Sequence, residues 1–149
     1  MEERLALRIK LFRETGQVRA ETAEFVSAEL EALAAAGRPV SEETAGMLTS
    51  HLMMALTRLQ NGEPVEEFTT DEQVAAELAA HPGAVALAQE IAGRAEGALG
   101  AALPGSEINF LALHLAVLAQ RPPAGSAAPA GSAAGARTPP DGQRRREQP

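Results

Sequence analysis

Apolar side chains recur every three or four residues along most of this chain, between glycines and prolines that end helices. The clearest case is a single apolar stripe over residues 20–35, which Gly37 closes. The stripe consists of Ala23, Val26, Leu30 and Leu33. Up to residue 120, Ala, Leu, Glu and Arg dominate and β-branched residues are scarce, so helix propensity agrees with the periodicity. The sequence therefore predicts an all-α protein.

Five further helices are predicted from the same signals. We expect them over residues 5–16, 41–60, 70–78, 84–99 and 106–120. Ser41 is the expected N-cap of the second of these, and Thr70 with Gln73 forms a capping-box pattern at the start of the third. The alternation of leucine and isoleucine near the N-terminus also fits a strand, but one isolated strand has nothing to pair with. Helices of this length with short connections predict a bundle of about five to six helices.

Composition divides the chain into three parts. We expect an N-terminal helical extension over residues 1–18, a helical bundle over 19–120 and a disordered tail rich in Pro, Ala, Gly and Ser over 121–149. Residues 1–120 carry 8 basic and 18 acidic side chains, a net charge of −10, whereas the tail carries a net +3. An acidic bundle repels phosphate backbones, so direct nucleic-acid binding is not expected.

Several other classes of protein are disfavoured. The chain has no cysteine, which excludes disulfides, thiol nucleophiles and Cys-ligated metal centres. Its longest apolar run, residues 108–119, is too short to span a bilayer, and Glu2 and Glu3 stand where a signal peptide needs positive charge. A cytoplasmic protein without membrane contact is therefore expected.

No standard catalytic motif is present, so we predict that the protein is not an enzyme and needs no cofactor. With three histidines and no cysteine, a metal centre would need His and Glu ligands at unusual spacing, and none is predicted. A metal enzyme with His and Glu ligands is a third and less favoured functional class, and direct nucleic-acid binding by the acidic bundle is the least favoured. His81, which precedes Pro82, is interpreted as an exposed residue at a helix end.

The unusual residues are His51 and His114, which lie in the middle of predicted helices among apolar neighbours. Leucine or alanine would pack better there and would need no hydrogen-bond partner. The ordinary interpretation is that both are structural histidines with satisfied hydrogen bonds. A functional interpretation depends on the segments that contain them.

Those two segments are TSHLMMALTRLQNGE, residues 49–63, and LPGSEINFLALHLA, residues 103–116. They resemble the two signature segments of the PRD family, the regulation domains of the bacterial phosphoenolpyruvate-dependent sugar phosphotransferase system (PTS). The first pattern is Leu-Thr-x-His, followed by an arginine and then a glycine; the second is Leu-Pro-x-x-Glu-x-x-Phe-(Ile/Leu)-x-Leu-His. The pattern positions are occupied here by His51, Arg58, Gly62, Glu107, Phe110 and His114. The resemblance covers about residues 21–119.

The resemblance implies an all-α bundle of about five helices that is often dimeric. It implies that His51 and His114 accept phosphoryl groups from a phosphohistidine carrier such as HPr or from an enzyme II component. The chain is thus expected to be a small stand-alone PRD that regulates gene expression or a partner protein through dimerisation or partner binding. The alternative is a helical interaction or dimerisation module without phosphoryl chemistry.

Arg58 and Glu107 are the residues that the resemblance places near the phosphate. Arg58 would steady the phosphate or the approaching carrier, or else form a salt bridge with Glu63 or Glu107. Glu107 would fix the tautomer of His114 from across the bundle, or else cap its own helix. The sequence departs from the family pattern at Ser50, where many members have an acidic or amide residue. The leading stretch over residues 8–18 resembles that of small single-domain members.

Overall fold

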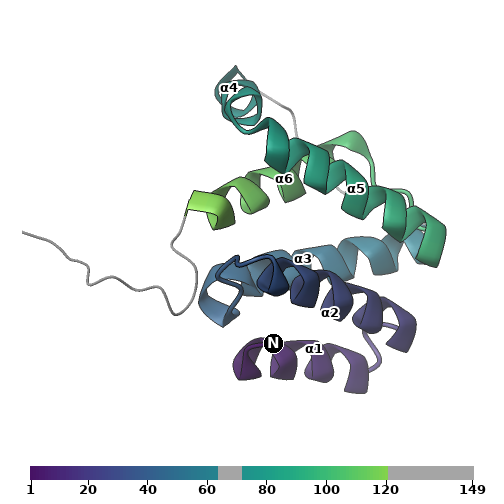
Figure 1. The fold of residues 1–149 in the computed structure, drawn as a ribbon. Coiled ribbons are helices and arrows are strands. Elements are labelled where there is room, and N and C mark those ends of the chain that lie inside the picture. Colours follow the sequence, from purple (N-terminus) through teal and green to yellow (C-terminus); the bar gives the residue numbers. More distant parts are fainter. Residues whose placement is uncertain (64–71, 121–149) are drawn as a thin grey trace, which may run out of the picture.

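The computed structural model describes residues 1–63 and 72–120, which form six α-helices and, within these ranges, no strand (Figure 1). The helices are α1 (Glu3–Glu14), α2 (Ala20–Ala35), α3 (Glu42–Gln60), α4 (Glu72–Ala80), α5 (Pro82–Leu99) and α6 (Gly105–Gln120). The all-α prediction is confirmed. The expected tail over 121–149 and the expected capping residue Thr70 lie outside the described residues.

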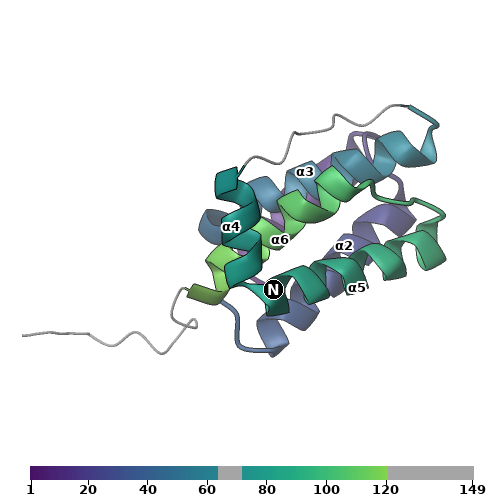
Figure 2. The ribbon, with the colours of Figure 1, turned by 90° about the horizontal axis from the view of Figure 1, so that it is seen from above.

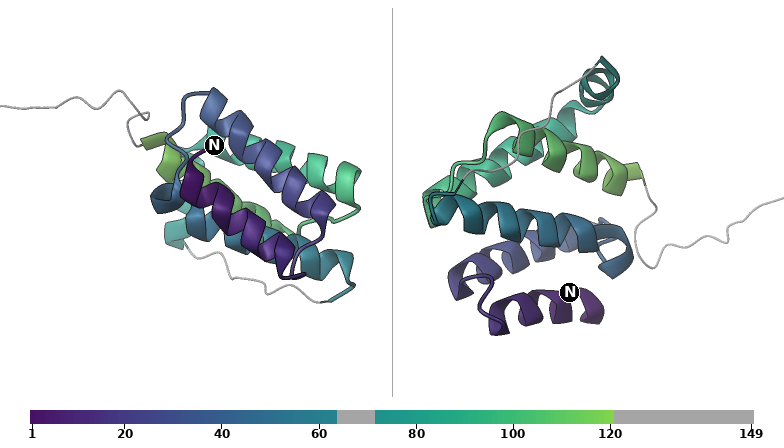
Figure 3. Two further views of the ribbon diagram at one scale, coloured as in Figure 1. Left: turned by 90° about the horizontal axis from the view of Figure 1, so that it is seen from below. Right: turned by 180° about the vertical axis from the view of Figure 1, so that it is seen from behind.

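The helices are stacked in layers, with α1 at one end, α2 and α3 next, α5 and α6 beyond them, and α4 at the other end (Figure 1). Helix α1 packs against α2 and α3, and these two in turn contact α5 and α6. Seen from below, α1 lies across the α2–α3 pair, and the view from behind shows α3 between α1 and α6 (Figure 3). The short helix α4 lies at the far end, where it contacts α5 and α6 and buries none of its residues. Helices α2 and α3 therefore form the middle layer, which joins α1 to α5 and α6.

Local signals in the sequence fix the helix ends. The Ser41 hydroxyl accepts a hydrogen bond from the Thr44 amide at 3.3 Å, and the Ser41 amide donates to the Thr44 hydroxyl at 2.9 Å. This reciprocal pair is a capping box, and it confirms Ser41 as the N-cap of α3. Helix α5 begins with Pro82 and ends at Gly100, whose φ of +68° is readily adopted only by glycine.

One hydrophobic core runs through the stack, and α1 is part of it. Leu5 and Ile9 of α1 are buried in the same cluster as the core residues of α2, α3, α5 and α6. Polar contacts add to this attachment, since Arg8 of α1 pairs with Glu42 and its Nη1 donates to the Ser50 hydroxyl of α3 at 2.8 Å. None of the helices that the structure describes combines the length and apolar character that crossing a membrane requires.

Burial within α3 makes a direct test of this packing. Leu56 is fully buried, whereas Met47 of the same helix is 78% exposed. We expect Leu56→Ala to lower the free energy of unfolding by about 2–5 kcal/mol, because it leaves a cavity between the layers. Met47→Ala should change it by about 0.5 kcal/mol or less. Urea unfolding followed by circular dichroism measures both values, and equal losses in the two variants would contradict this packing.

Candidate functional site

Helices α3 and α6 lie side by side and bring the two motif histidines together (Figure 2). His51 comes from the middle of α3 and His114 from the middle of α6. The ring of Phe110 lies between them: it stacks on His51 with 4.0 Å between ring centroids and an interplanar angle of 26°, and it is 4.5 Å from His114 at 44°. Phe110 and His114 are four residues apart on one face of α6. The result is a row of three aromatic rings across the seam between two helices.

Glu107 joins this row from the first turn of α6. Its Oε1 is 2.6 Å from Nε2 of His51, so the two side chains share a hydrogen bond. The Glu107 side chain is only 3% exposed. An anion is favoured in the first turn of a helix by the helix dipole. The sequence-based expectation that Glu107 serves His114 or caps α6 is therefore replaced by an observed bond to His51.

Both imidazoles are partly buried, and the surroundings of His114 shift its pKa. The His51 side chain is 32% exposed, and the His114 side chain is partly buried. Burial lowers the pKa of His114 below its ordinary value, and the nearby His51 lowers it further. Neither ring is enclosed in the core.

Arg58 does not join the histidines. It lies near the end of α3, where its Nη1 is 3.8 Å from Oε1 of Glu63, with both side chains about half exposed. Gly62, the glycine of the first motif pattern, has a φ of +73°, which explains the glycine as a helix stop. The structure thus brings together three of the four predicted site residues, and it gives Arg58 the Glu63 salt bridge that the sequence left as an alternative.

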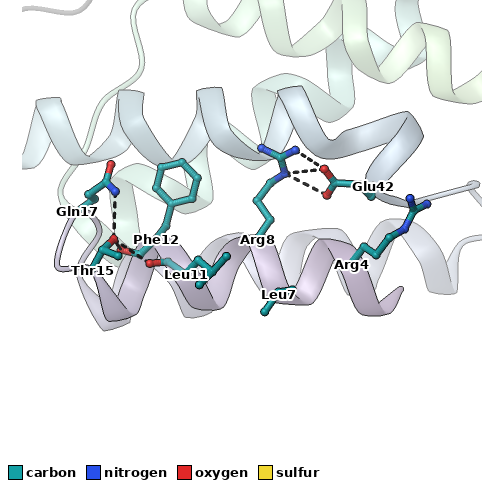
Figure 4. A pocket seen from close by; sticks show the side chains of 8 residues that line it. All are labelled: Arg4, Leu7, Arg8, Leu11, Phe12, Thr15, Gln17 and Glu42. Atoms are coloured by element: carbon teal, nitrogen blue, oxygen red, sulfur yellow. Dashed lines mark hydrogen bonds and ion pairs between the residues drawn. The ribbon is translucent and has the colours of Figure 1, made fainter.

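A hollow in the described chain lies elsewhere, along α1 (Figure 4). It has a volume of about 510 Å³, and none of the motif residues lines it. In Figure 4 Phe12 and Arg8 point toward α3, while Leu7 and Leu11 point away from it. Among the described residues, no cluster of three or more His, Asp or Glu side chains is arranged so that it could bind a metal ion.

Two contacts of the site were not predicted as functional. Phe110 was recognised only as a motif position, although its spacing from Glu107 and His114 places all three on one helical face. The second is the bond from Arg8 to Ser50, which ties α1 to α3 one residue before His51. The signal in the sequence that pointed to this contact was Ser50 itself, which stands where many family members have an acidic or amide residue.

Comparison with known families gives this arrangement a context. A family model for the PRD domain matches residues 31–118, which is more than half of the chain. The match begins within α2 and ends within α6, so it includes both histidines and leaves α1 outside. No curated protein and no solved structure matched the chain. The family predicted from the two histidine segments is confirmed, and the chain belongs to the PRD domain family.

Proposed function

We propose that this protein is a stand-alone PTS regulation domain that is phosphorylated on His51 and His114 by a PTS phosphocarrier, either HPr or an enzyme II component. Membership of the PRD family supports the general part, because PRD domains are histidine-phosphorylated regulatory targets rather than catalysts. The observation that carries the specific part is the row formed by His51, Phe110 and His114 at the α3–α6 seam.

Phosphoryl acceptance requires an imidazole with a lone pair on one nitrogen. A neutral histidine can attack phosphorus in line, whereas an imidazolium cannot. The lowered pKa of His114 favours its neutral form at physiological pH. The exposed part of His51 gives a carrier protein a surface to approach. Both histidines therefore fit the role of acceptor, each through a different property of its surroundings.

Phosphorylation would change the charge of a domain that is already acidic. A phosphoryl group adds about two negative charges at neutral pH. Residues 1–120 already carry a net charge of −10, and the seam contains the buried Glu107 carboxylate. Repulsion at this seam is a direct way to shift a helix pair or a dimer interface. We propose that the output is homodimerisation or the binding of a partner protein in the cytoplasm, and through it the regulation of gene expression or of that partner.

Arg58 is too far along α3 to contact His51 directly, but its position suits a role in binding the carrier protein. It lies on the same face of α3 as His51, two helical turns further on, or about 10.5 Å along the axis. A half-exposed guanidinium at that distance suits contact with a carrier that approaches His51. We propose that Arg58 contributes to carrier docking rather than to holding the phosphate on His51.

The phosphotransfer reaction tests the central proposal. Incubation of the full chain with phosphoenolpyruvate, enzyme I and HPr should give acid-labile phosphate on His51 and His114, measured by mass spectrometry. Each of His51→Gln and His114→Gln should remove one labelled site. His81→Gln is the matched control, because His81 contacts Glu77 and Gln120 away from the seam, and its replacement should leave the labelling unchanged. Sedimentation of the same samples reports any change in oligomeric state.

Absence of label on both histidines with HPr and with enzyme II components would contradict the proposal. The alternative, an interaction module without phosphoryl chemistry, makes a different prediction. It requires that the double variant with Gln at positions 51 and 114 keeps the partner binding and the oligomeric state of the unmodified protein.

Arg58→Ala separates carrier docking from stability. We expect transfer from HPr to slow by up to about tenfold, which corresponds to about 1.4 kcal/mol, because a charge at the rim of an interface mainly affects association. The free energy of unfolding should change by no more than about 1 kcal/mol, since the Arg58–Glu63 pair is exposed. Arg94→Ala is the control: Arg94 is about as exposed and also ion-paired, but lies on α5. Equal transfer rates for the Arg58 variant and the unmodified protein would contradict the docking role.

The lowered pKa of His114 predicts how stability depends on pH. The unfolded chain takes up this proton near pH 6.5, whereas the folded protein takes it up only at lower pH. The contribution of His114 to stability is therefore complete above about pH 6.5 and is lost as the pH falls toward the folded-state pKa. We expect His114→Gln to be less sensitive than the unmodified protein to a fall from about pH 7.5 to 5.5. Urea unfolding at both pH values measures this, and equal sensitivity would contradict it.

A further inference from the structure

We propose that Glu107 is a positioning residue that holds His51 in the Nε2–H tautomer and thereby directs phosphoryl transfer to Nδ1 of that ring. This inference rests on the proposed function, because it names which of the two nitrogens of His51 becomes the acceptor. It starts from the short contact between Nε2 of His51 and Oε1 of Glu107, 2.6 Å across the α3–α6 seam.

The carboxylate has few alternatives to this bond. Glu107 is 3% exposed, so water cannot readily replace the imidazole as its donor. No group among the described residues bonds its other oxygen, Oε2. A buried carboxylate depends strongly on the hydrogen bonds that it accepts, and here the one observed side-chain donor is Nε2 of His51. The tautomer with hydrogen on Nε2 is thus the one that the buried anion stabilises.

The ring is also restrained in its plane. Phe110 stacks on His51 at 4.0 Å, and it comes from the same face of α6 as Glu107. One contact sets the plane of the imidazole and the other sets its rotation within that plane. A buried carboxylate that orients a histidine and fixes its tautomer is the arrangement used by catalytic triads. In both cases the nitrogen opposite the carboxylate carries the lone pair.

The transfer step balances without any proton transfer. The lone pair on Nδ1 of His51 attacks the phosphorus held by the phosphohistidine of the carrier, so one N–P bond forms and the carrier's N–P bond breaks. The bonding electron pair returns to the carrier's imidazole, which leaves as a neutral ring because its other nitrogen keeps its hydrogen. The His51 ring keeps its Nε2–H and becomes a phosphorylated cation, and the carboxylate of Glu107 offsets that positive charge.

Attachment at Nε2 would have opposite consequences. It would break the bond to Glu107 and place a phosphoryl dianion against a buried carboxylate in the same seam. His114 has no such carboxylate contact in the described structure, so its acceptor nitrogen is not set in this way. In the same molecule, the phosphorylated nitrogen of His51 therefore tests the role of Glu107, and that of His114 serves as the internal reference.

The position of the phosphoryl group is measured by long-range ¹H–¹⁵N and ³¹P NMR on the full chain phosphorylated by HPr. In the protein with the parent sequence, we expect the phosphoryl group on Nδ1 of His51. Glu107→Leu keeps the volume and burial but removes the acceptor, and Glu107→Ala removes the side chain. Both variants should shift part of the His51 label to Nε2. Glu90→Gln, which alters an exposed carboxylate on α5, should keep the pattern of the unmodified protein.

A second measurement does not require phosphorylation. In the absence of phosphorylation, the ¹⁵N chemical shifts of the His51 ring report its tautomer. We expect the Nε2–H tautomer in the protein with the parent sequence and a shift toward Nδ1–H in the two Glu107 variants. Phosphate on Nε2 of His51 in the protein with the parent sequence would overturn the inference. So would Glu107 variants in which both the tautomer of His51 and the position of its phosphoryl group stay unchanged. Absence of phosphate on both His51 and His114 would instead overturn the proposed function, and the tautomer spectra would then decide the role of Glu107 alone.

Discussion

The burial of one carboxylate shapes the centre of this molecule. Glu107 lies 3% exposed at the start of α6, and a charge in that position is tolerated only with a hydrogen-bond donor beside it. His51 supplies that donor from α3, 56 residues earlier in the chain. The bond joins the two helices that carry the proposed phosphorylation sites. The relative placement of α3 and α6 therefore depends on a contact whose donor is itself the proposed target of modification.

This dependence gives a physical route from modification to a change in shape. The rings of His51, Phe110 and His114 form a continuous row, so charge added to either end acts on a ring that touches both helices. In closely packed protein, a displaced side chain moves its neighbours, because few voids are left to accommodate the displacement. The body of the domain is acidic as well, and a further negative charge gains no favourable counter-charge from it.

The sequence predicted the fold well where one face of a helix is buried. The expected helix over residues 20–35 coincides with α2, whose apolar stripe faces the core. The N-terminal segment was ambiguous, since its apolar residues alternate as in a strand. The structure explains why: Leu5 and Ile9 are buried at helical spacing, whereas Leu7 and Leu11 are each 52% exposed. Exposed leucines on α1 imitate a strand pattern that buried residues alone would not have produced.

The site was less predictable, because its pairings cross between helices. The resemblance to the two family segments singled out both histidines and placed Glu107 near the phosphate, but it could not show that Glu107 pairs with His51, since that depends on how α3 packs against α6. The same limit applies to Ser50, which departs from the usual acidic or amide residue of the family. In this chain Ser50 accepts a hydrogen bond from Arg8, and Arg8 also pairs with Glu42. A shift of α3 at His51 would therefore act on α1 through Ser50 as well as on α6 through Glu107, which connects the helix outside the family match to the proposed phosphorylation site.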